Sequence, residues 1–189
     1  MFVDKTAYGL RVPFTTTWLV RWAAPARGQV VIFADPADAT RILVKRVVAV
    51  AGDRLQWDER GLVLNGIPIA QRPLPDADRW HGEVPIEIAA SQSYAAVIES
   101  LGDRHHRMLV GPDNTHEPGT IVVPAGYVFV FGDMRPLARD SRNFGPVATD
   151  TVLGRAAVVW LSCPEPLFGN GWLCDPRTIR WGRIGRGVQ

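Results

Sequence analysis

The residues most able to carry chemistry lie in one apolar segment, from Ile42 to Asp53, which contains Lys45 followed by Arg46. If this segment is a β-strand, alternation places Lys45 on the same face as three aliphatic residues, Leu43, Val47 and Ala49. Burial among aliphatic side chains lowers the pKa of a lysine, which can then act as a general base near neutral pH. The alternative is a lysine that marks an edge strand or extends its ammonium group into solvent.

A second polar segment runs from Phe131 to Val147, where a strand-like start leads into alternating acidic and basic residues. Within it, the run from Pro136 to Arg142 is expected to form a turn of helix. Asp140 is placed to pair with Arg142 or with Arg46. On its residues alone, the segment is predicted to be a loop held in place by ion pairs, each of small value if it is exposed.

Together, the two segments resemble the type I signal peptidases, membrane-anchored serine proteases that use a serine–lysine dyad to remove secretory signal peptides. The family's lysine motif, KR followed five residues later by GD, is matched by Lys45, Arg46, Gly52 and Asp53. Its last motif, GDNR…S-x-DSR…G-x-V, is matched by Gly132, Asp133, Arg135, Asp140, Ser141, Arg142, Gly145 and Val147. Further similar stretches occur at Lys5–Gly9, Arg27–Phe33 and Arg180–Gly185, so the resemblance covers nearly the whole chain.

The resemblance implies a role for each matched residue. Lys45 is the expected general base, and Leu43 and Val44 fall where the family lines the small pockets that accept alanine-like side chains. The residues expected to order the site are Arg46, Gly132, Asp133, Asp140 and Arg142. The expected partner is the signal peptide of a preprotein, bound as an extended strand beside the lysine.

The sequence departs from the family pattern at two places. The motif with the nucleophilic serine would fall before Met1, and no serine elsewhere fits it. Ala138 stands where the family has a serine that hydrogen-bonds the lysine. Three explanations remain open: a start codon assigned too far downstream, a deliberately shortened sequence, and an inactive paralogue that still binds signal-peptide-like strands.

Composition excludes some classes of protein. The 189 residues are 47% hydrophobic and 21% charged, with a net charge of +2, which is ordinary for a globular protein and excludes disorder. Charges are scattered rather than gathered in basic runs, so nucleic acid is not an expected partner. No stretch approaches the roughly 18 to 20 apolar residues of a spanning helix. The resemblance nevertheless implies the periplasmic face of a bacterial inner membrane, with the membrane surface as a second partner.

The chain is predicted to be a single mainly β domain, residues 1–189, of several short antiparallel sheets. Short apolar runs rich in Val, Ile and aromatic residues are bounded by Gly, Pro and Asp, as in many-stranded β proteins. The strands expected are 29–33, 42–50, 54–58, 62–64, 107–110, 119–123, 127–131 and 154–161. Between about residues 71 and 107 the periodicity fades, which predicts an inserted β lobe.

Three other groups of residues could carry a structural or functional role. Cys163 and Cys174 flank a loop-like run and either form a disulfide or stay as two thiols. The adjacent pair His105 and His106 would point to opposite faces of a strand, so no metal site is expected, and no cofactor is indicated. Trp18 and Trp22, with Phe14 and Leu19, form either an apolar patch that rests on a bilayer or an ordinary buried hairpin.

Overall fold

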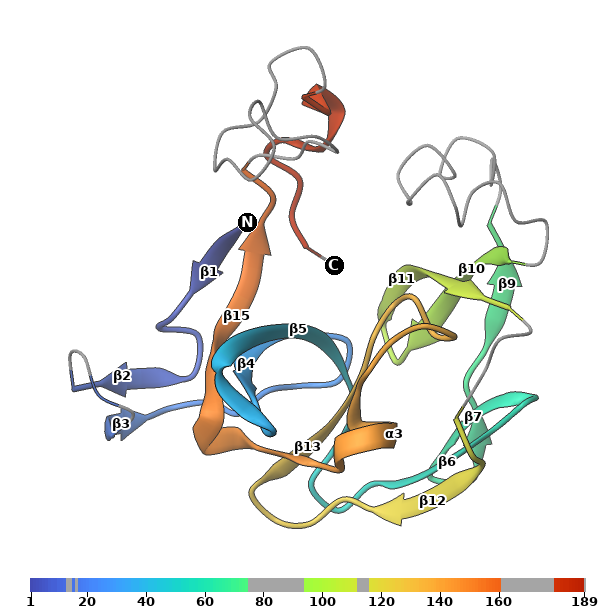
Figure 1. Ribbon diagram of the computed structural model, residues 1–189, viewed down its shortest axis with the longest axis horizontal. Coiled ribbons are helices and arrows are strands. Elements are labelled where there is room, and N and C mark those ends of the chain that lie inside the picture. The colour runs from blue at the N-terminus through green and yellow to red at the C-terminus, as the bar shows by residue number, and fades with distance from the viewer. Residues whose placement is uncertain (13–14, 16, 75–93, 112–115, 161–178, 189) are drawn as a thin grey trace.

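The computed structural model describes residues 1–12, 15, 17–74, 94–111, 116–160 and 179–188. These residues form mainly antiparallel strands in several sheets, so the predicted fold class is confirmed (Figure 1). The largest sheet has the order β1-β15-β4-β5-β13-β14. Its strands span Phe2–Asp4 (β1), Val152–Val158 (β15), Val30–Asp35 (β4), Asp38–Val50 (β5), Tyr127–Phe131 (β13) and Val147–Ala148 (β14).

Three smaller sheets complete the described fold. One has the order β12-β6-β7-β8, with strands at Gly119–Val122, Arg54–Asp58, Gly61–Leu64 and Ile67–Pro68. Another has the order β11-β10-β9, at Arg104–Val110, Ala95–Leu101 and Gln71–Pro73. The third is the hairpin of β2 (Gly9–Arg11) and β3 (Trp18–Arg21). The described helices are short: α3 (Ser141–Phe144), η1 (Thr149–Thr151) and η3 (Trp181–Arg183).

The long strand β5 carries both residues of the lysine motif. It forms a tight hairpin with β4, in a register that runs from Asp35↔Asp38 to Val30↔Arg46. Pro36 lies in the two-residue connection, where its fixed φ favours a turn. On the other side of β5, β13 pairs only with residues from Arg46 to Val50. Among the described strands, β5 is therefore paired on one edge alone from Asp38 to Lys45.

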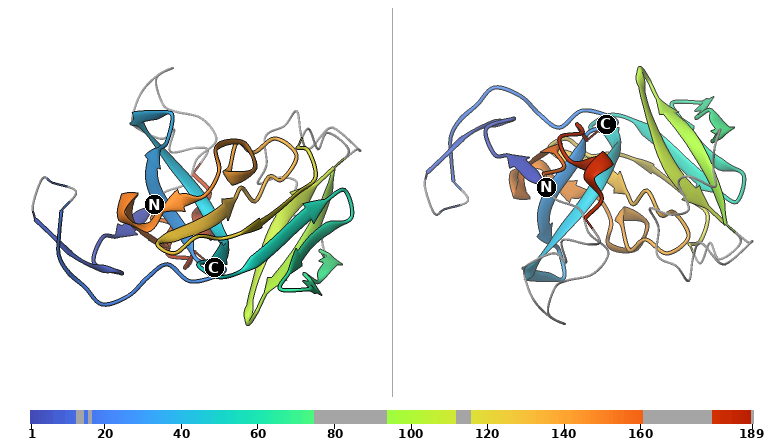
Figure 2. Two further views of the ribbon diagram at one scale, coloured as in Figure 1. Left: turned by 90° about the horizontal axis from the view of Figure 1, so that it is seen from below. Right: turned by 90° about the horizontal axis from the view of Figure 1, so that it is seen from above.

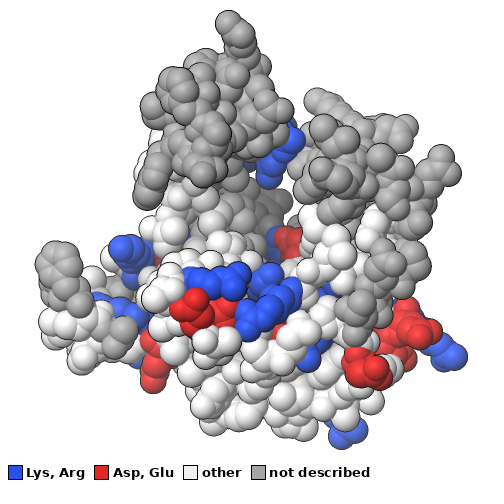
Figure 3. Space-filling view, viewed as in Figure 1, with Lys and Arg blue, Asp and Glu red and all other residues white. Residues whose placement is uncertain are grey.

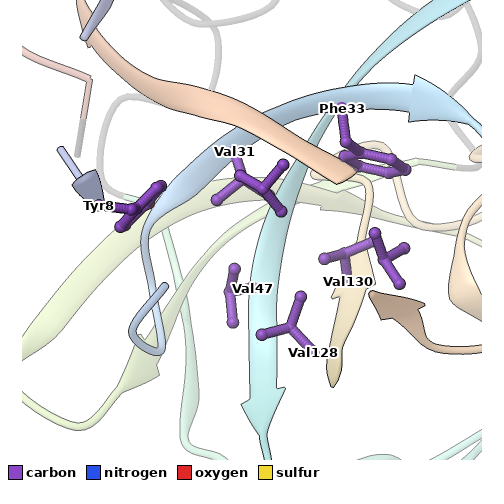
Figure 4. Packing of buried hydrophobic residues seen from close by; sticks show 8 residues of the cluster. Tyr8, Val31, Phe33, Val47, Val128 and Val130 are labelled. Atoms are coloured by element: carbon purple, nitrogen blue, oxygen red, sulfur yellow. The ribbon is translucent and has the colours of Figure 1, made fainter. Parts of the chain in front are cut away.

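The core of the large sheet lies between its central strands and the residues after β1. Figure 4 shows Val31, Val47, Val128 and Val130 pointing toward a common space, with Phe33 at one end and Tyr8 at the other. The three strands β4, β5 and β13 each contribute to this cluster. Their β-branched side chains are well suited to a pleated, buried surface.

A bulge interrupts the alternation of β5. The pairing with β13 shifts between Phe129 and Val130, so that Val48 has no direct partner there. Val47 consequently packs in the cluster of Figure 4, whereas Val48 and Ala49 both pack in a second cluster with Phe129 and the β6–β7 sheet. The prediction that Ala49 shares a face with Val47 and Lys45 is wrong, because a bulge reverses the side-chain phase.

Local strand predictions agree with the structure to different degrees. Both β6 and β13 have the predicted bounds, whereas β5 begins at Asp38 rather than Ile42 because its hairpin with β4 continues further. The predicted helical turn at Pro136–Arg142 is wrong: α3 spans Ser141–Phe144 and starts where the Asp140 side chain caps it. Cys163 and Cys174 lie outside the described residues.

The sheet β11-β10-β9 occupies most of the described part of the predicted lobe. Figure 2 shows this sheet, in green, beside the six-stranded sheet. It is joined to the body by a parallel bridge between Leu109 and Met134. The backbone of Leu109 also bonds with the carbonyl of Asp133 and the amide of Arg135, at 2.8 and 3.1 Å.

The hairpin β2-β3 projects from the body (Figure 1). Leu19 and Trp22 are exposed on it, but Trp18 is not: it packs against the core, and the guanidinium groups of Arg11 and Arg21 lie over its ring. Trp18 is therefore not part of an exposed patch, and Phe14 lies outside the described residues. No helix in the described parts of the chain is long and apolar enough to span a bilayer.

Candidate active site

Lys45 lies on β5 at the point where β13 ends its pairing with that strand. Its side chain is half-buried, and burial lowers the pKa of its ammonium group below the ordinary 10.5. The negative charge of Asp140 opposes this shift and the positive charge of Arg142 adds to it. A lysine with a lowered pKa is more often neutral at a given pH, so its amine is better able to accept a proton.

Gly132 and Ala138 bound the space around the lysine nitrogen. A Cβ atom placed on Gly132 would lie 3.4 Å from Lys45 Nζ and would overlap the methyl group of Ala138. Lys45 and Ala138 therefore approach each other over a residue that has no side chain. Ala138 presents only a methyl group here, which cannot hydrogen-bond the amine.

Arg46 and Asp133 tie β5 to the segment that follows β13. The guanidinium group donates from Nε to Asp133 Oδ1 at 2.8 Å and from Nη2 to Oδ2 at 2.7 Å. Its Nη1 also donates to the carbonyl of Gly28 at 2.9 Å. Arg46 is buried, and this two-pronged geometry fixes it more firmly than a single contact would. Arg46 thus pairs with Asp133, and not with Asp140, which the sequence had offered as an alternative partner.

Asp140 and Arg142 form a second, more deeply buried pair. Arg142 donates from Nε to Asp140 Oδ1 at 2.8 Å and from Nη2 to Oδ2 at 2.6 Å. The same carboxylate accepts the amide of Arg142 at 3.1 Å, which caps α3, and the amide of Gly132 at 3.0 Å. Asn143 completes a capping box by accepting from the Asp140 amide. The Asp140 carboxylate thus fixes both the start of α3 and the backbone of Gly132 next to Lys45.

The two predicted pocket residues lie on the part of β5 that is paired on one side. Leu43 is half-buried against the core cluster, and Val44 is 44% exposed. Close by, Arg139 forms an ion pair with the buried Asp35 at the end of β4. Figure 3 shows basic and acidic side chains next to each other at the centre of this face rather than a field of one sign.

Glu99 and His106 of the sheet β11-β10-β9, together with Arg135 of the segment after β13, join this site without having been assigned a role in it from the sequence. Glu99 is fully buried on β10 and pairs with Arg135, while His106 on β11 approaches both Glu99 and Asp133. Arg135 belongs to the matched motif but had no assigned role. The sequence signal that could have identified Glu99 is its position within the apolar run Ala95–Leu101, because a buried charge requires a partner.

This arrangement contains an amine able to accept a proton, but neither of the serines within the described residues is free to act as a nucleophile beside it. Ser141 is buried and its hydroxyl accepts the amide of Val130 at 3.0 Å, and Ser100 is hydrogen-bonded to His105 at 2.8 Å. Among the residues that the structure describes, no cluster of three or more metal-binding side chains occurs. The chemistry that the site can offer is proton transfer by Lys45.

Comparison with known proteins agrees with this geometry. The family model for signal peptidase, peptidase S26, matches residues 1–161. Signal peptidase I of Pseudomonas fluorescens is 30% identical over 185 residues, covering 90% of this chain and 61% of that protein. Signal peptidase I of Pseudomonas aeruginosa is 30% identical over 188 residues, with the same two coverages.

A crystal structure of signal peptidase I from Enterococcus faecalis aligns with a TM-score of 0.43 at 23% identity, covering 70% of this chain and 97% of that one. The chain spans about three fifths (61%) of the length of the two Pseudomonas relatives. The family model, by contrast, matches most of the present sequence. On that match, the chain belongs to the signal peptidase family, peptidase S26.

Proposed function

We propose that this chain is the catalytic-type β-domain of a signal peptidase I-like serine endopeptidase that removes signal peptides from exported proteins. The observation that carries the proposal is the position of Lys45, half-buried against Gly132 where β13 leaves the edge of β5. Its lowered pKa favours the neutral amine that a general base requires. The family membership supplies the reaction class.

The proposed substrate is a signal peptide that adds to β5 as an extended strand. Among the described strands, none pairs with the second edge of β5 from Asp38 to Lys45, so its backbone groups there are available to a peptide. Such a strand would run in line with β13 and end beside the amine of Lys45. Leu43 and Val44 would then contact its side chains and select small ones.

In the proposed reaction, Lys45 transfers a proton in each of two half-reactions: from the serine to the departing amine, and then from water to the serine oxygen. Its neutral amine takes the proton of a serine hydroxyl as the serine oxygen bonds to the scissile carbonyl carbon, and the ammonium then protonates the departing amine. Water next hydrolyses the serine ester, with Lys45 again as base. The described serines, Ser100 and Ser141, are engaged elsewhere, and no other serine in the sequence fits the family's motif. The proposal therefore assigns the nucleophile to a serine outside residues 1–189.

The proposal places the domain on the periplasmic face of a bacterial inner membrane, in contact with its surface. Exposed aromatic residues that suit a membrane interface occur on described parts of the chain. Phe2 and Trp160 are 62% and 52% exposed with ring centroids 6.0 Å apart, and Trp181 is 71% exposed. Trp22 and Leu19 of the hairpin are exposed as well.

One observation favours a second candidate, a catalytically inactive paralogue that binds signal-peptide-like strands. Ala138 places a methyl group next to Gly132 and Lys45, so the amine lacks a side-chain hydroxyl at this position to orient it. A strand-binding edge on β5 does not require that hydroxyl. The two candidates therefore predict the same peptide binding and differ in cleavage.

Cleavage of a labelled signal peptide tests the proposal. The chain as given and the protein read from the next upstream in-frame start are each compared with their Lys45→Arg variants. Arginine keeps the positive charge but cannot lose its proton, so the rate should fall by roughly 10²–10⁴-fold while peptide binding persists. Lys5→Arg, in an exposed turn, is the matched control and should leave the rate unchanged.

Each outcome decides between the candidates. Cleavage by the longer protein alone, lost in Lys45→Arg, establishes a peptidase whose serine lies outside this sequence. Peptide binding without cleavage in either protein establishes the inactive paralogue. Cleavage at the same rate in Lys45→Arg refutes the role of Lys45 as base.

A further inference from the structure

The sheet β11-β10-β9 contributes a fully buried carboxylate, that of Glu99, next to the site. Glu99 on β10 is 0% exposed. Its Oε2 pairs with Arg135 Nη2, Gln71 Nε2 lies 3.3 Å from its Oε1, and His106 Nε2 lies 3.3 Å from Oε2. These groups come from β9, β11 and the segment after β13, so charged and polar side chains surround Glu99 from each neighbouring element.

Arg135 connects this carboxylate to the glycine beneath Lys45. Its Nε donates to the carbonyl of Gly132 at 3.2 Å, and its guanidinium group lies 5.0 Å from the ring centre of Phe131. The amide of Gly132 donates to Asp140 at 3.0 Å. The backbone of Gly132 is therefore held on its amide side by Asp140 and on its carbonyl side by Arg135.

A second chain of contacts reaches the other residue of the lysine motif. His106 Nε2 lies 3.8 Å from Asp133 Oδ1, and Asp133 receives both hydrogen bonds from Arg46, the neighbour of Lys45. Glu99 thus contacts Arg135, which bonds to Gly132, and His106, which approaches the partner of Arg46, Asp133.

We propose that Glu99 is a positioning residue, which through Arg135 fixes the Gly132 backbone against which the Lys45 ammonium group lies. A buried ion pair is a poor source of stability compared with apolar residues of the same volume, so packing alone does not account for a charged pair here. The name positioning residue rests on the proposed function, but the effect on Lys45 is measurable without cleavage.

The test is the titration of Lys45, followed by NMR of its Cε and Nζ in the chain as given. In Glu99→Gln, Arg135 loses the counter-charge that holds it against the Gly132 carbonyl, so this backbone loosens and water gains access to the amine. Because burial is the main cause of the lowered pKa, the Lys45 pKa should rise toward its ordinary value of 10.5. Glu59→Gln removes the same charge from an exposed turn and should leave the titration unchanged.

Glu99→Gln could prevent folding, because it leaves Arg135 buried without its counter-charge. The double variant Glu99→Gln, Arg135→Met removes both charges and avoids that cost. It should show the same upward shift of the Lys45 pKa, because the Gly132 carbonyl then has no anchor. An unchanged pKa in the double variant means that the pair only fills space, and overturns the proposal.

A downward shift in Glu99→Gln also overturns it, because loss of a distant negative charge acting through space would lower the lysine pKa. Failure of the proposed function is seen separately, as the absence of peptide cleavage by the longer protein. That result leaves the Lys45 titration unaffected, so the two proposals can fail independently.

Discussion

Gly132 leaves open the space that the Lys45 ammonium group occupies. A Cβ atom at this glycine would stand 3.4 Å from Lys45 Nζ and would collide with the methyl group of Ala138. The glycine does not have a positive φ, so its backbone conformation is open to any residue. What it contributes is space, and the contact between the lysine and its surroundings depends on that space.

Gly132→Ala should therefore destabilise the protein by about 1–3 kcal/mol through overpacking. Ala138→Gly in the same chain removes the atom that is overlapped and should restore part of the loss. The coupling free energy of this double-mutant cycle, measured by urea unfolding, is expected to be favourable.

Gly182→Ala is the control, because an added Cβ there meets no atom within 4 Å. It should change the free energy of unfolding by less than about 0.5 kcal/mol. Equal destabilisation by Gly132→Ala with and without Ala138→Gly would show that the collision with Ala138 is not the cause.

Breaking the ion pair of Asp140 and Arg142 should cost far more stability than breaking a surface pair. Asp140→Asn keeps an amino acid that caps helices well but removes the charge that faces the buried Arg142. Leaving a buried guanidinium group without its counter-charge is expected to lower the free energy of unfolding by about 3–5 kcal/mol. Urea unfolding measures the change.

Asp150→Asn is the matched control for that experiment. Asp150 also pairs with an arginine, Arg21, but its side chain is 70% exposed. An exposed pair is worth about 1 kcal/mol or less. Similar losses in the two variants would mean that burial of Asp140 does not strengthen its pair.

The sequence predicts the parts of this fold that depend on local pattern. Alternation and turn residues place β6 and β13 correctly at both ends, because their apolar faces pack directly on the core. The bulge opposite Val48 could not be predicted, because it depends on how β5 meets β13. The start of α3 was predictable in principle, since Asp140 and Asn143 have the spacing of a capping box.

The residues of the candidate site also divide into those that the sequence motifs predict and those that they do not. The matched motifs bring Lys45, Gly132 and Asp140 to one place, but they do not say that Glu99 lies behind them. That contact joins β10 to a segment 36 residues further along the chain. No local pattern specifies such a long-range pair, and only the buried charge within an apolar strand indicated that a partner must exist.

Glu99 should make the protein sensitive to acid. Burial raises the pKa of this carboxyl, but the charge of Arg135, with further contributions from His106, outweighs burial and lowers the pKa to about 2 from 4.5. Stability that comes from the ionised carboxylate is complete above pH 4.5 and is lost as the pH falls toward 2. A shift of this size corresponds to something on the order of 3 kcal/mol.

Urea unfolding of the wild type and of Glu99→Gln between pH 2 and pH 6 measures this contribution. The wild type should lose more stability across this range than the variant does, because the variant has no carboxyl to protonate. Parallel curves for the two proteins would show that the pKa of Glu99 does not change on folding.

The edge of β5 provides the most direct test of strand addition. β5 pairs with β4 from Asp38 to Arg46, with an irregularity between Asp38 and Ile42, and with β13 only from Arg46 to Val50. The amides on its other edge between Asp38 and Lys45 therefore have no strand partner within the described fold. Amides without such partners exchange readily with solvent. A signal peptide that pairs with this edge should slow deuterium exchange between Asp38 and Lys45.

Two controls make that slowing specific. The strand β6 lies between β12 and β7, so its exchange should not change when peptide is added. A peptide with the same side chains but with alternate backbone amides methylated cannot donate to the edge and should give little protection. Protection that appears on β9 or β10 instead, or that survives methylation, would place the peptide elsewhere. The backbone of β5 would then not be the element that holds the substrate beside Lys45.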